Sequence, residues 1–148
     1  MVFAPGAAPK DRKGFMAWYS TVVEWGEDHG YDDPKVCAPP LTAWFHDIRA
    51  DFPPMNGPFA PPDDVDSPRL TDYSLGRQAI YAAFAWSQMR PARRAMFDLA
   101  KKHRLGFFDA SADDGQVWAP TLFGYRLAHG AGSTEALPIR WGEGNARS

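Results

Sequence analysis

The sequence predicts one α+β domain, a two-layer sandwich of three helices beside an antiparallel sheet of about four strands. Two observations predict this class. Three stretches carry apolar residues at helical spacing, and several short apolar or alternating runs are separated by turn signals. The length of 148 residues is typical of one domain. We place the domain at residues 1–122 and expect residues 123–148, which lose periodicity and are glycine-rich, to form a mobile tail.

The helices are predicted from their caps and buried stripes. Asp11 caps a first helix that runs to about His29, where Gly30 closes it, and the other two helices are expected at residues 40–52 and 88–104. Strands are expected from short runs between the turn signals, at residues 2–4, 78–86, 105–110 and 116–118, with a possible further strand at 72–75. Residues 52–68 are rich in proline and are expected to form a long loop.

Composition indicates a globular chain, with 45% hydrophobic and 23% charged residues. The net charge of −2 is unevenly distributed. Residues 1–89 hold seven Lys/Arg and twelve Asp/Glu, a balance of −5, whereas residues 90–148 hold nine and six, a balance of +3. Such a dipolar surface suits steering toward a charged protein, and a nucleic-acid binder is usually basic overall.

Cysteine usage and the start of the chain predict a cytoplasmic protein that does not enter a membrane. Cys37 is the single cysteine, so no internal disulfide can form, which fits a reducing compartment. The first ten residues lack the basic-then-apolar pattern of a signal peptide, and no apolar run approaches the roughly 20 residues of a membrane span.

Catalytic and metal motifs are missing from the sequence. Cys37 has no basic residue within a helical turn after it to activate the thiol, and His29 and His46 lie outside any known ligand spacing. No phosphate-binding glycine motif or serine elbow occurs. We therefore expect no enzyme activity, no metal, no cofactor and no small-molecule substrate. A small enzyme with a spatially assembled His/carboxylate site stays open as an alternative.

Acidic residues give the sharpest candidate site. Residues 24–33 hold five acids and no Lys or Arg, and the predicted helix end there would add its partial negative charge unless a cation folds over the segment. The loop from Asp63 to Asp66 is also acidic, and Trp25 and Tyr31 could serve as aromatic anchors. The predicted partner-binding residues are Glu24, Trp25, Glu27, Asp28, Tyr31, Asp32, Asp33, Asp63, Asp64 and Asp66.

The third predicted helix is basic on one side. At about 100° per residue its basic side holds Arg90, Arg93, Arg94, Lys101 and Arg104, with Phe97 as an aromatic exception, and its core side holds Ala92, Ala95, Met96, Leu99 and His103. A basic stripe with an aromatic residue could contact nucleic acid or an acidic protein, but a solubilising outer face is the more common role. A nucleic-acid-associated regulator that uses residues 88–104 is therefore kept as a second alternative.

Four segments resemble a family of small bacterial proteins encoded beside polymorphic or secreted toxins. They are VVEWGEDHGYDDP, FPPMNGPFAP, TDYSLGRQAIYAAFAWS and LAKKHRLGFFDASADDGQVWAP, and the likeness covers about residues 15–120. The resemblance implies an immunity protein that neutralises a cognate toxin by occluding its active face, and it assigns no catalytic residue. The leading hypothesis is therefore a cytoplasmic protein whose acidic surface binds a basic toxin.

Overall fold

The computed structural model describes residues 1–131 and shows an α+β fold built on one open antiparallel sheet. The sheet has the strand order β2-β3-β1-β4-β5-β6. Its strands are β1 (Val2–Phe3), β2 (Asp72–Leu75), β3 (Ala79–Ala83), β4 (Gly106–Phe108), β5 (Val117–Thr121) and β6 (Gly124–His129). The helices are α1 (Arg12–Val22), α2 (Pro39–Ile48) and α3 (Met89–Lys102), with 3-10 turns η1 (Pro5–Ala7), η2 (Pro34–Val36) and η3 (Trp86–Gln88).

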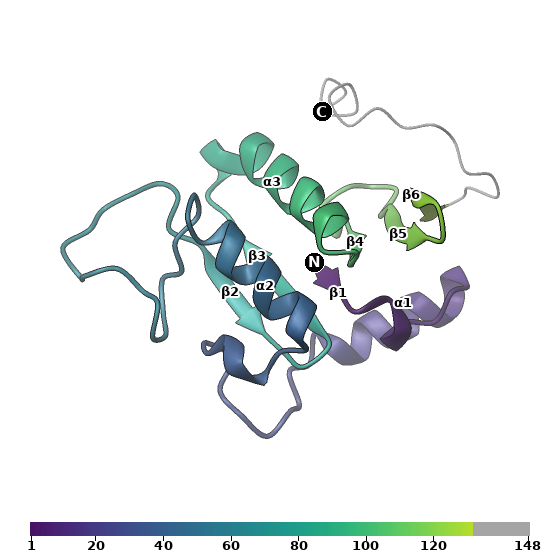
Figure 1. Ribbon diagram of the computed structural model, residues 1–148, viewed down its shortest axis with the longest axis horizontal. Helices are drawn as coiled ribbons and strands as arrows, with labels where there is room; N and C mark the ends of the chain where they lie inside the picture. Colours follow the sequence, from purple (N-terminus) through teal and green to yellow (C-terminus); the bar gives the residue numbers. More distant parts are fainter. Residues whose placement is uncertain (132–148) are drawn as a thin grey trace.

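The α+β class and the antiparallel sheet are confirmed, but the prediction of two layers is wrong because helices cover both faces of the sheet. Successive side chains of a strand point to opposite faces. In β1, Val2 packs in the core that contains α2 and α3, whereas Phe3 packs against Phe15 of α1. Figure 1 shows α2 and α3 in front of the sheet and α1 behind it.

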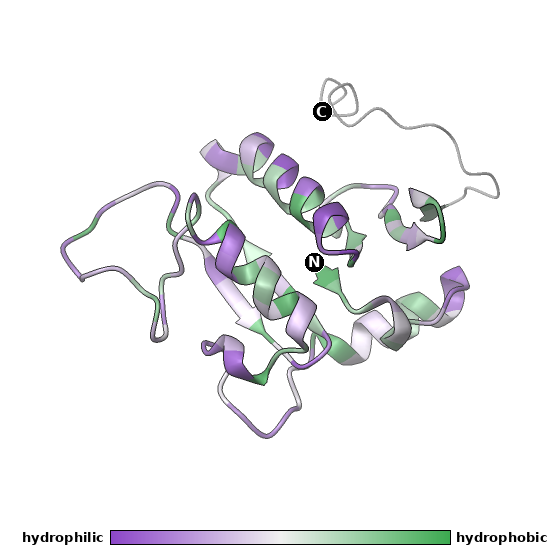
Figure 2. Cartoon of the chain, in the orientation of Figure 1, coloured by the Kyte–Doolittle hydropathy of each residue, from purple (hydrophilic) through white to green (hydrophobic). Residues whose placement is uncertain are grey.

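The larger core lies between the sheet and the helix pair α2–α3. Trp44, Phe45 and Ile48 of α2 are buried there, and the indole N–H of Trp44 donates to the carbonyl of Met96 in α3 at 3.3 Å. Figure 2 shows hydrophilic residues along the outer side of α3 and hydrophobic ones toward the sheet. This packing fixes α2, which forms the support for the loop that follows it.

The first helix ends at Val22, and the prediction that it reaches His29 is wrong. Asp11 does cap it, since its carboxylate accepts from the N–H of Gly14 at 2.8 Å. After Val22 the chain leaves helical geometry, and Trp25 adopts a left-handed φ of 51°. Acidic residues are unfavourable in the last turn of a helix, where the dipole is negative, which agrees with their position in a loop. The helix dipole therefore adds nothing to the charge of residues 27–33.

The sheet extends beyond the predicted boundary at residue 122, so that part of the domain assignment is wrong. β6 pairs with β5 through the register Trp118↔Leu127, and Leu127 is buried. The hydroxyl of Tyr125 donates to the carbonyl of Leu105 at 2.7 Å. The prediction of a mobile tail falls, for residues 132–148, outside the described residues. The strand count of about four becomes six, because residues 72–75 and 124–129 both join the sheet.

Phe97 lies on the sheet side of α3, contrary to its predicted place on the basic side. Its ring lies edge-on to those of Phe107, Trp118 and Tyr125, with centroids 5.7, 5.2 and 5.5 Å away. Arg93, one turn earlier, also turns inward and forms an ion pair with Asp109 at 3.2 Å. The basic side of α3 is therefore narrower than the sequence pattern indicates.

Candidate functional site: acidic loops beside the sheet

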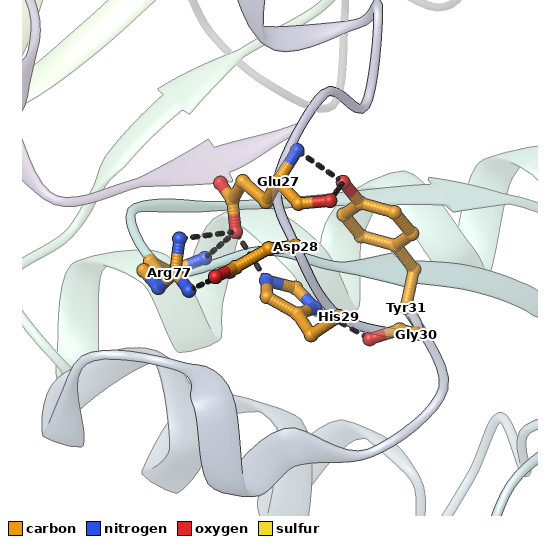
Figure 3. Close-up of polar contacts among 6 residues, drawn as sticks. All are labelled: Glu27, Asp28, His29, Gly30, Tyr31 and Arg77. Carbon is orange, nitrogen blue, oxygen red and sulfur yellow. Dashed lines mark hydrogen bonds and ion pairs between the residues drawn. The ribbon is translucent and has the colours of Figure 1, made fainter.

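The acidic segment 24–33 is contacted by a cation, the guanidinium of Arg77 in the β2–β3 turn. The guanidinium of Arg77 forms an ion pair with Asp28 and lies 4.0 Å from a carboxylate oxygen of Glu27, whose same oxygen accepts the backbone N–H of Arg77 at 3.1 Å. These contacts lower the pKa of Asp28, first through its hydrogen bond to Arg77. Figure 3 shows the two carboxylates and Arg77 facing each other.

His29 contacts the same cluster through both of its ring nitrogens. One ring nitrogen lies against the Glu27 carboxylate and the other contacts the carbonyl of Gly30, both of which are hydrogen-bond acceptors (Figure 3). Two acceptors require two ring N–H groups, which only the imidazolium supplies. The pKa of His29 is accordingly raised, chiefly by the Gly30 carbonyl and then by Glu27. When His29 is protonated, its charge and that of Arg77 balance the carboxylates of Glu27 and Asp28.

The aromatic residues of this segment support its backbone. The N–H of Glu27 donates to the hydroxyl of Tyr31 at 2.7 Å, and that hydroxyl donates to the Glu27 carbonyl at 3.1 Å. The ring of Trp25 lies edge-on to Tyr31 with centroids 5.3 Å apart. Both aromatic side chains are partly buried, so each has internal contacts as well as some accessible surface.

The other three predicted acids of the segment differ in their partners. Asp33 accepts from the N–H of Lys35 at 3.0 Å, which caps η2, and its carboxylate lies 3.6 Å from the Lys35 ammonium. Glu24 and Asp32 are exposed and form no ion pair with any residue in 1–131. Only these two leave uncompensated negative charge in the segment.

The long loop between α2 and β2 is fixed at its two ends. Pro54 and Thr71 form a parallel bridge, in which Met55 N–H donates to the Thr71 carbonyl and Thr71 N–H to the Pro53 carbonyl, each at 2.9 Å. Two residues from the bridge on each side of the loop, the buried hydroxyl of Tyr73 donates to the Phe52 carbonyl at 2.7 Å. Figure 1 shows this loop projecting from the molecule beside β2.

Two further contacts hold the loop against the domain. Phe59 packs on α2, where its ring lies 5.0 Å from that of His46 and under the guanidinium of Arg49 at 4.4 Å. Gly57 approaches the acidic segment so closely that a Cβ there would lie 2.1 Å from the carbonyl oxygen of Asp32, and its φ of +89° is a conformation suited to glycine. The long loop that carries Asp63, Asp64 and Asp66 therefore contacts the acidic segment at Gly57.

Beyond these anchors the loop presents three carboxylates to solvent. Val65 N–H donates to the Pro62 carbonyl at 3.0 Å, which closes a turn with Asp63 and Asp64 at its centre. Asp63, Asp64 and Asp66 are exposed and form no ion pair with any described residue. Val65, between them, keeps 40% of its surface exposed. Three uncompensated acids are thus placed together on one turn of the anchored loop.

Groups that could serve catalysis or bind a metal are dispersed. Cys37 is buried, and desolvation, with smaller effects from Glu27 and Asp33, raises its pKa to about 12, so the thiol is protonated at neutral pH. Among residues 1–131 no three His, Cys, Asp or Glu side chains lie together as a metal site would need. His46 accepts a hydrogen bond from Arg49 at 3.0 Å and lies on the outside of α2. No helix of the described part of the chain is long and apolar enough to cross a membrane.

The basic charge of α3 is partly compensated. Besides the Arg93–Asp109 pair, Lys102 and His103 lie 2.9 and 2.6 Å from the carboxylate of Asp47 in α2. These pairs reduce the positive field that a nucleic acid would meet.

Three exposed apolar side chains were not predicted as site residues. Leu122 and Phe123 occupy the β5–β6 turn with 85% and 96% of their surfaces exposed, and Trp86 in η3 is 86% exposed. Arg104, at a left-handed φ of 58°, supports that turn by donating to the carbonyls of Thr121 and Gly124. The adjacent Leu and Phe before Gly124 are the only sequence signal of this tip.

Comparison with known proteins gives no assignment at the level of family, curated relative or fold. No protein family, no curated protein and no solved structure matches the chain. The resemblance to toxin-associated immunity proteins therefore stays a prediction.

Proposed function

We propose that the chain is an immunity-type protein that binds a cognate bacterial toxin and blocks the toxin's basic active face. The observation that carries the proposal is the turn with Asp63, Asp64 and Asp66, whose three exposed carboxylates have no ion-pair partner among residues 1–131. Toxins that act on nucleic acids or nucleotides present basic clefts, and complementary charge accelerates association and fixes the binding orientation.

The anchoring of the loop supports the same function. A tight complex loses less free energy on binding when its contact loop is ordered beforehand. The bridge between Pro54 and Thr71 and the packing of Phe59 on α2 provide that order. Val65 and Met55, which is 51% exposed, add apolar surface beside the acids. An interface with a charged turn and a small apolar contact is the arrangement expected of an inhibitor that enters a cleft.

Glu24 and Asp32 extend the proposed surface, whereas the Glu27–Arg77 cluster has a different role in it. The contact of Gly57 with Asp32 joins the long loop to the acidic segment. Because Glu27 contacts His29 and Arg77, and Asp28 forms an ion pair with Arg77, we assign both acids to shaping that segment rather than to charge attraction. The sequence alone predicts Glu27 and Asp28 as partner-binding residues within one acidic cluster with Asp32 and Asp33.

The alternatives have less support. A nucleic-acid regulator would need a broad basic face on α3, and the ion pairs with Asp109 and Asp47 narrow that face. The expected His/carboxylate site of a small enzyme would need a histidine beside a cavity, and His29 and His46 instead contact Glu27 with Gly30 and Arg49, respectively. Cytoplasmic location remains a prediction from the sequence.

The experiment uses the toxin domain encoded beside this chain. Its complex with the wild-type chain is measured by titration calorimetry and by rescue of growth on co-expression. The variant Asp63→Asn/Asp64→Asn/Asp66→Asn should bind at least tenfold more weakly, about 1.4 kcal/mol, because close charge pairs at such interfaces couple by about 1.5–7 kcal/mol. Its melting temperature should be unchanged, since the three side chains are exposed.

The matched control removes the same charge elsewhere. Asp72→Asn/Asp98→Asn/Asp113→Asn changes three exposed acids outside the loop and should keep the wild-type affinity. If both variants weakened binding equally, the loss of affinity would come from the net charge of the chain and not from the acidic loop. Wild-type affinity of the loop variant, or no complex between the wild-type chain and the toxin domain, would contradict the proposal.

A further inference from the structure

The turn between β5 and β6 carries two neighbouring apolar side chains that are almost fully exposed. Leu122 keeps 85% of its surface exposed and Phe123 keeps 96%. Thr121 pairs with Gly124 in the last step of the β5–β6 register, so Leu122 and Phe123 form the apex of a two-residue hairpin loop. Of the large apolar side chains that are exposed in residues 1–131, these two alone are adjacent in the sequence. A single exposed apolar residue is ordinary, whereas apolar side chains that gather at one place on a surface mark a contact site.

The end of α3 holds this apex in place. Arg104 follows α3 at a left-handed φ of 58°, and its guanidinium donates to the carbonyls of Thr121 and Gly124, the latter at 3.1 Å. On the next residue of β6, the hydroxyl of Tyr125 donates to the carbonyl of Leu105 at 2.7 Å. The hairpin is therefore ordered before it meets a partner, and the Arg104 guanidinium lies beside the backbone just behind the two apolar side chains.

The chain around the apex is rich in cations. Residues 99–108 and 117–131 contain no Asp or Glu, and their basic residues are Lys101, Lys102, Arg104 and Arg126. Lys102 forms an ion pair with Asp47, whereas Lys101 and Arg126 are exposed and form no ion pair with a described residue. Asp114 lies at the opposite end of the hairpin, where its carbonyl accepts the N–H of Ala131. The apex thus combines apolar surface with uncompensated positive charge.

We propose that this apex, with Leu122, Phe123 and the cations Lys101, Arg104 and Arg126, docks on the surface of a lipid bilayer that contains anionic lipids. The two apolar side chains enter the boundary between headgroups and acyl chains, and the cations behind them contact the lipid phosphates. Each Lys or Arg close to an anionic leaflet adds to the attraction, so apolar insertion and positive charge act together. Arg104 can both support the turn and contact a phosphate, because its guanidinium has five N–H donors and uses only part of them for the two carbonyls.

The shape and the order of these groups favour a bilayer over an acidic protein. A protein partner would have to offer a pocket that fits two protruding side chains and has an acidic rim. A bilayer takes up a convex apolar apex without a preformed cavity, and its phosphates lie outside its acyl chains, just as Arg104 lies behind Phe123. The expectation that the chain does not enter a membrane concerns spanning segments of roughly 20 residues, and a two-residue apex is too short to register as one.

This surface is separate from the acidic loop of the proposed function. The loop leads into β2, and β2 and β6 are the two ends of the strand order. Figure 1 shows the loop and the β5–β6 hairpin on opposite sides of the molecule. The chain can therefore bind a bilayer and the proposed toxin at different places, and lipid binding does not depend on the proposed function.

The test mixes the full chain with sucrose-loaded vesicles and measures the bound fraction by sedimentation. A single myristoyl chain binds vesicles with a constant of about 10⁴ M⁻¹, and the apex is smaller, so half of the protein should be bound at roughly 1 mM lipid. This is expected for phosphatidylcholine and phosphatidylserine in equal amounts, whereas pure phosphatidylcholine should require at least tenfold more lipid, a difference of about 1.4 kcal/mol. No binding to the mixed vesicles at about 10 mM lipid would overturn the proposal in favour of an acidic protein partner. Equal binding to both kinds of vesicle would overturn the role of the cations.

Apolar variants place the binding at the apex. Leu122→Ser/Phe123→Ser should bind the mixed vesicles at least tenfold more weakly, about 1.4 kcal/mol, and should keep its melting temperature because both side chains are exposed. Trp86→Ser is the matched control, since it removes an 86% exposed apolar side chain elsewhere, and it should bind as the wild type does. Wild-type vesicle binding by the apex variant would refute the assignment of the site.

Charge variants test the cations in the same way. Lys101→Gln/Arg126→Gln should weaken binding to the mixed vesicles, whereas Lys10→Gln/Lys13→Gln, which removes two exposed cations near the start of α1, should bind close to the wild type. An equal loss in both variants would mean that net charge alone attracts the chain, contrary to the proposal.

The vesicle and toxin proposals fail separately. Asp63→Asn/Asp64→Asn/Asp66→Asn should bind the mixed vesicles at least as well as the wild type, and Leu122→Ser/Phe123→Ser should keep the wild-type affinity for the toxin domain. Loss of vesicle binding in the acidic-loop variant would show that lipid contacts the loop and not the apex.

Discussion

The base of the acidic loop depends on one buried hydrogen bond, and replacing Tyr73 with phenylalanine removes it. The Tyr73 hydroxyl donates to the Phe52 carbonyl at 2.7 Å, and both residues are buried, with Tyr73 7% and Phe52 1% exposed. Burial also raises the pKa of Tyr73, so the hydroxyl stays a donor throughout the physiological range. Phenylalanine keeps the ring contacts with Trp44 and Phe45 and removes only the donor.

The expected cost follows from what the substitution leaves behind. A buried carbonyl without its donor costs about 1–3 kcal/mol, more than the net value of an average hydrogen bond. In a chain of this size each kcal/mol lowers the melting temperature by about 2–4 °C. Urea unfolding should therefore show a lower midpoint with an unchanged slope, because the exposed surface on unfolding stays the same.

Tyr19→Phe is the matched control. The hydroxyl of Tyr19 makes no hydrogen bond with a described residue, and its ring packs on Phe108 at 4.7 Å. This control should change stability by less than about 0.5 kcal/mol, as is usual for surface substitutions. If Tyr73→Phe were equally neutral, the Tyr73–Phe52 hydrogen bond would not hold the base of the acidic loop in place.

Three further predictions concern the sheet and the acidic segment. Gly106→Ala should destabilise the fold by about 1–3 kcal/mol in urea unfolding, because the added Cβ would lie 2.2 Å from the ring of Phe3. A wild-type unfolding midpoint would show that Phe3 of β1 does not pack against Gly106. Leu127→Ala should cost about 2–5 kcal/mol in the same assay, whereas a cost under about 0.5 kcal/mol would place β6 outside the cooperative domain. The folded-state pKa of His29 lies above its ordinary value of 6.5. The stabilising contribution of His29 is therefore complete below about pH 6.5 and is lost as pH rises through the folded pKa. Glu27→Gln should lower the pKa of His29 in an NMR titration, and an unshifted titration would show that Glu27 does not hold the imidazole ring.

Local patterns predicted most of the regular structure. The apolar spacing of Leu41, Trp44, Phe45 and Ile48 indicated α2, and all four are buried. The alternation of residues 78–86 indicated β3, and the possible strand at 72–75 is β2. These segments were predictable because their burial follows from neighbours in the sequence.

Long-range contacts account for the errors. The end of α1 at Val22 depends on the left-handed turn at Trp25 and on Arg77, which binds Asp28 from 49 positions away. The sequence places residues 124–129 in the predicted tail, because β6 is stabilised by pairing with β5 and is not marked by a long apolar run. The approach of Gly57 to Asp32 likewise has no signal in either loop taken alone.

The sequence predicts which acidic residues belong to the candidate site but not which of them are paired with a cation. The sequence shows all ten predicted partner-binding residues, and their grouping into a balanced cluster and an uncompensated turn depends on where His29 and Arg77 lie in space. Net charge per segment cannot distinguish paired from unpaired carboxylates, since surface pairs form between residues far apart in the chain.

Amide hydrogen exchange of the chain with and without its cognate toxin domain tests the central claim most directly. We predict that binding slows exchange most at residues 63–67 and at Asp32, beside Gly57, while the β5–β6 turn at Leu122 and Phe123 exchanges as in the free chain. Protection confined to that turn, with none at residues 63–67, would contradict the claim that the acidic loop is the toxin-binding surface.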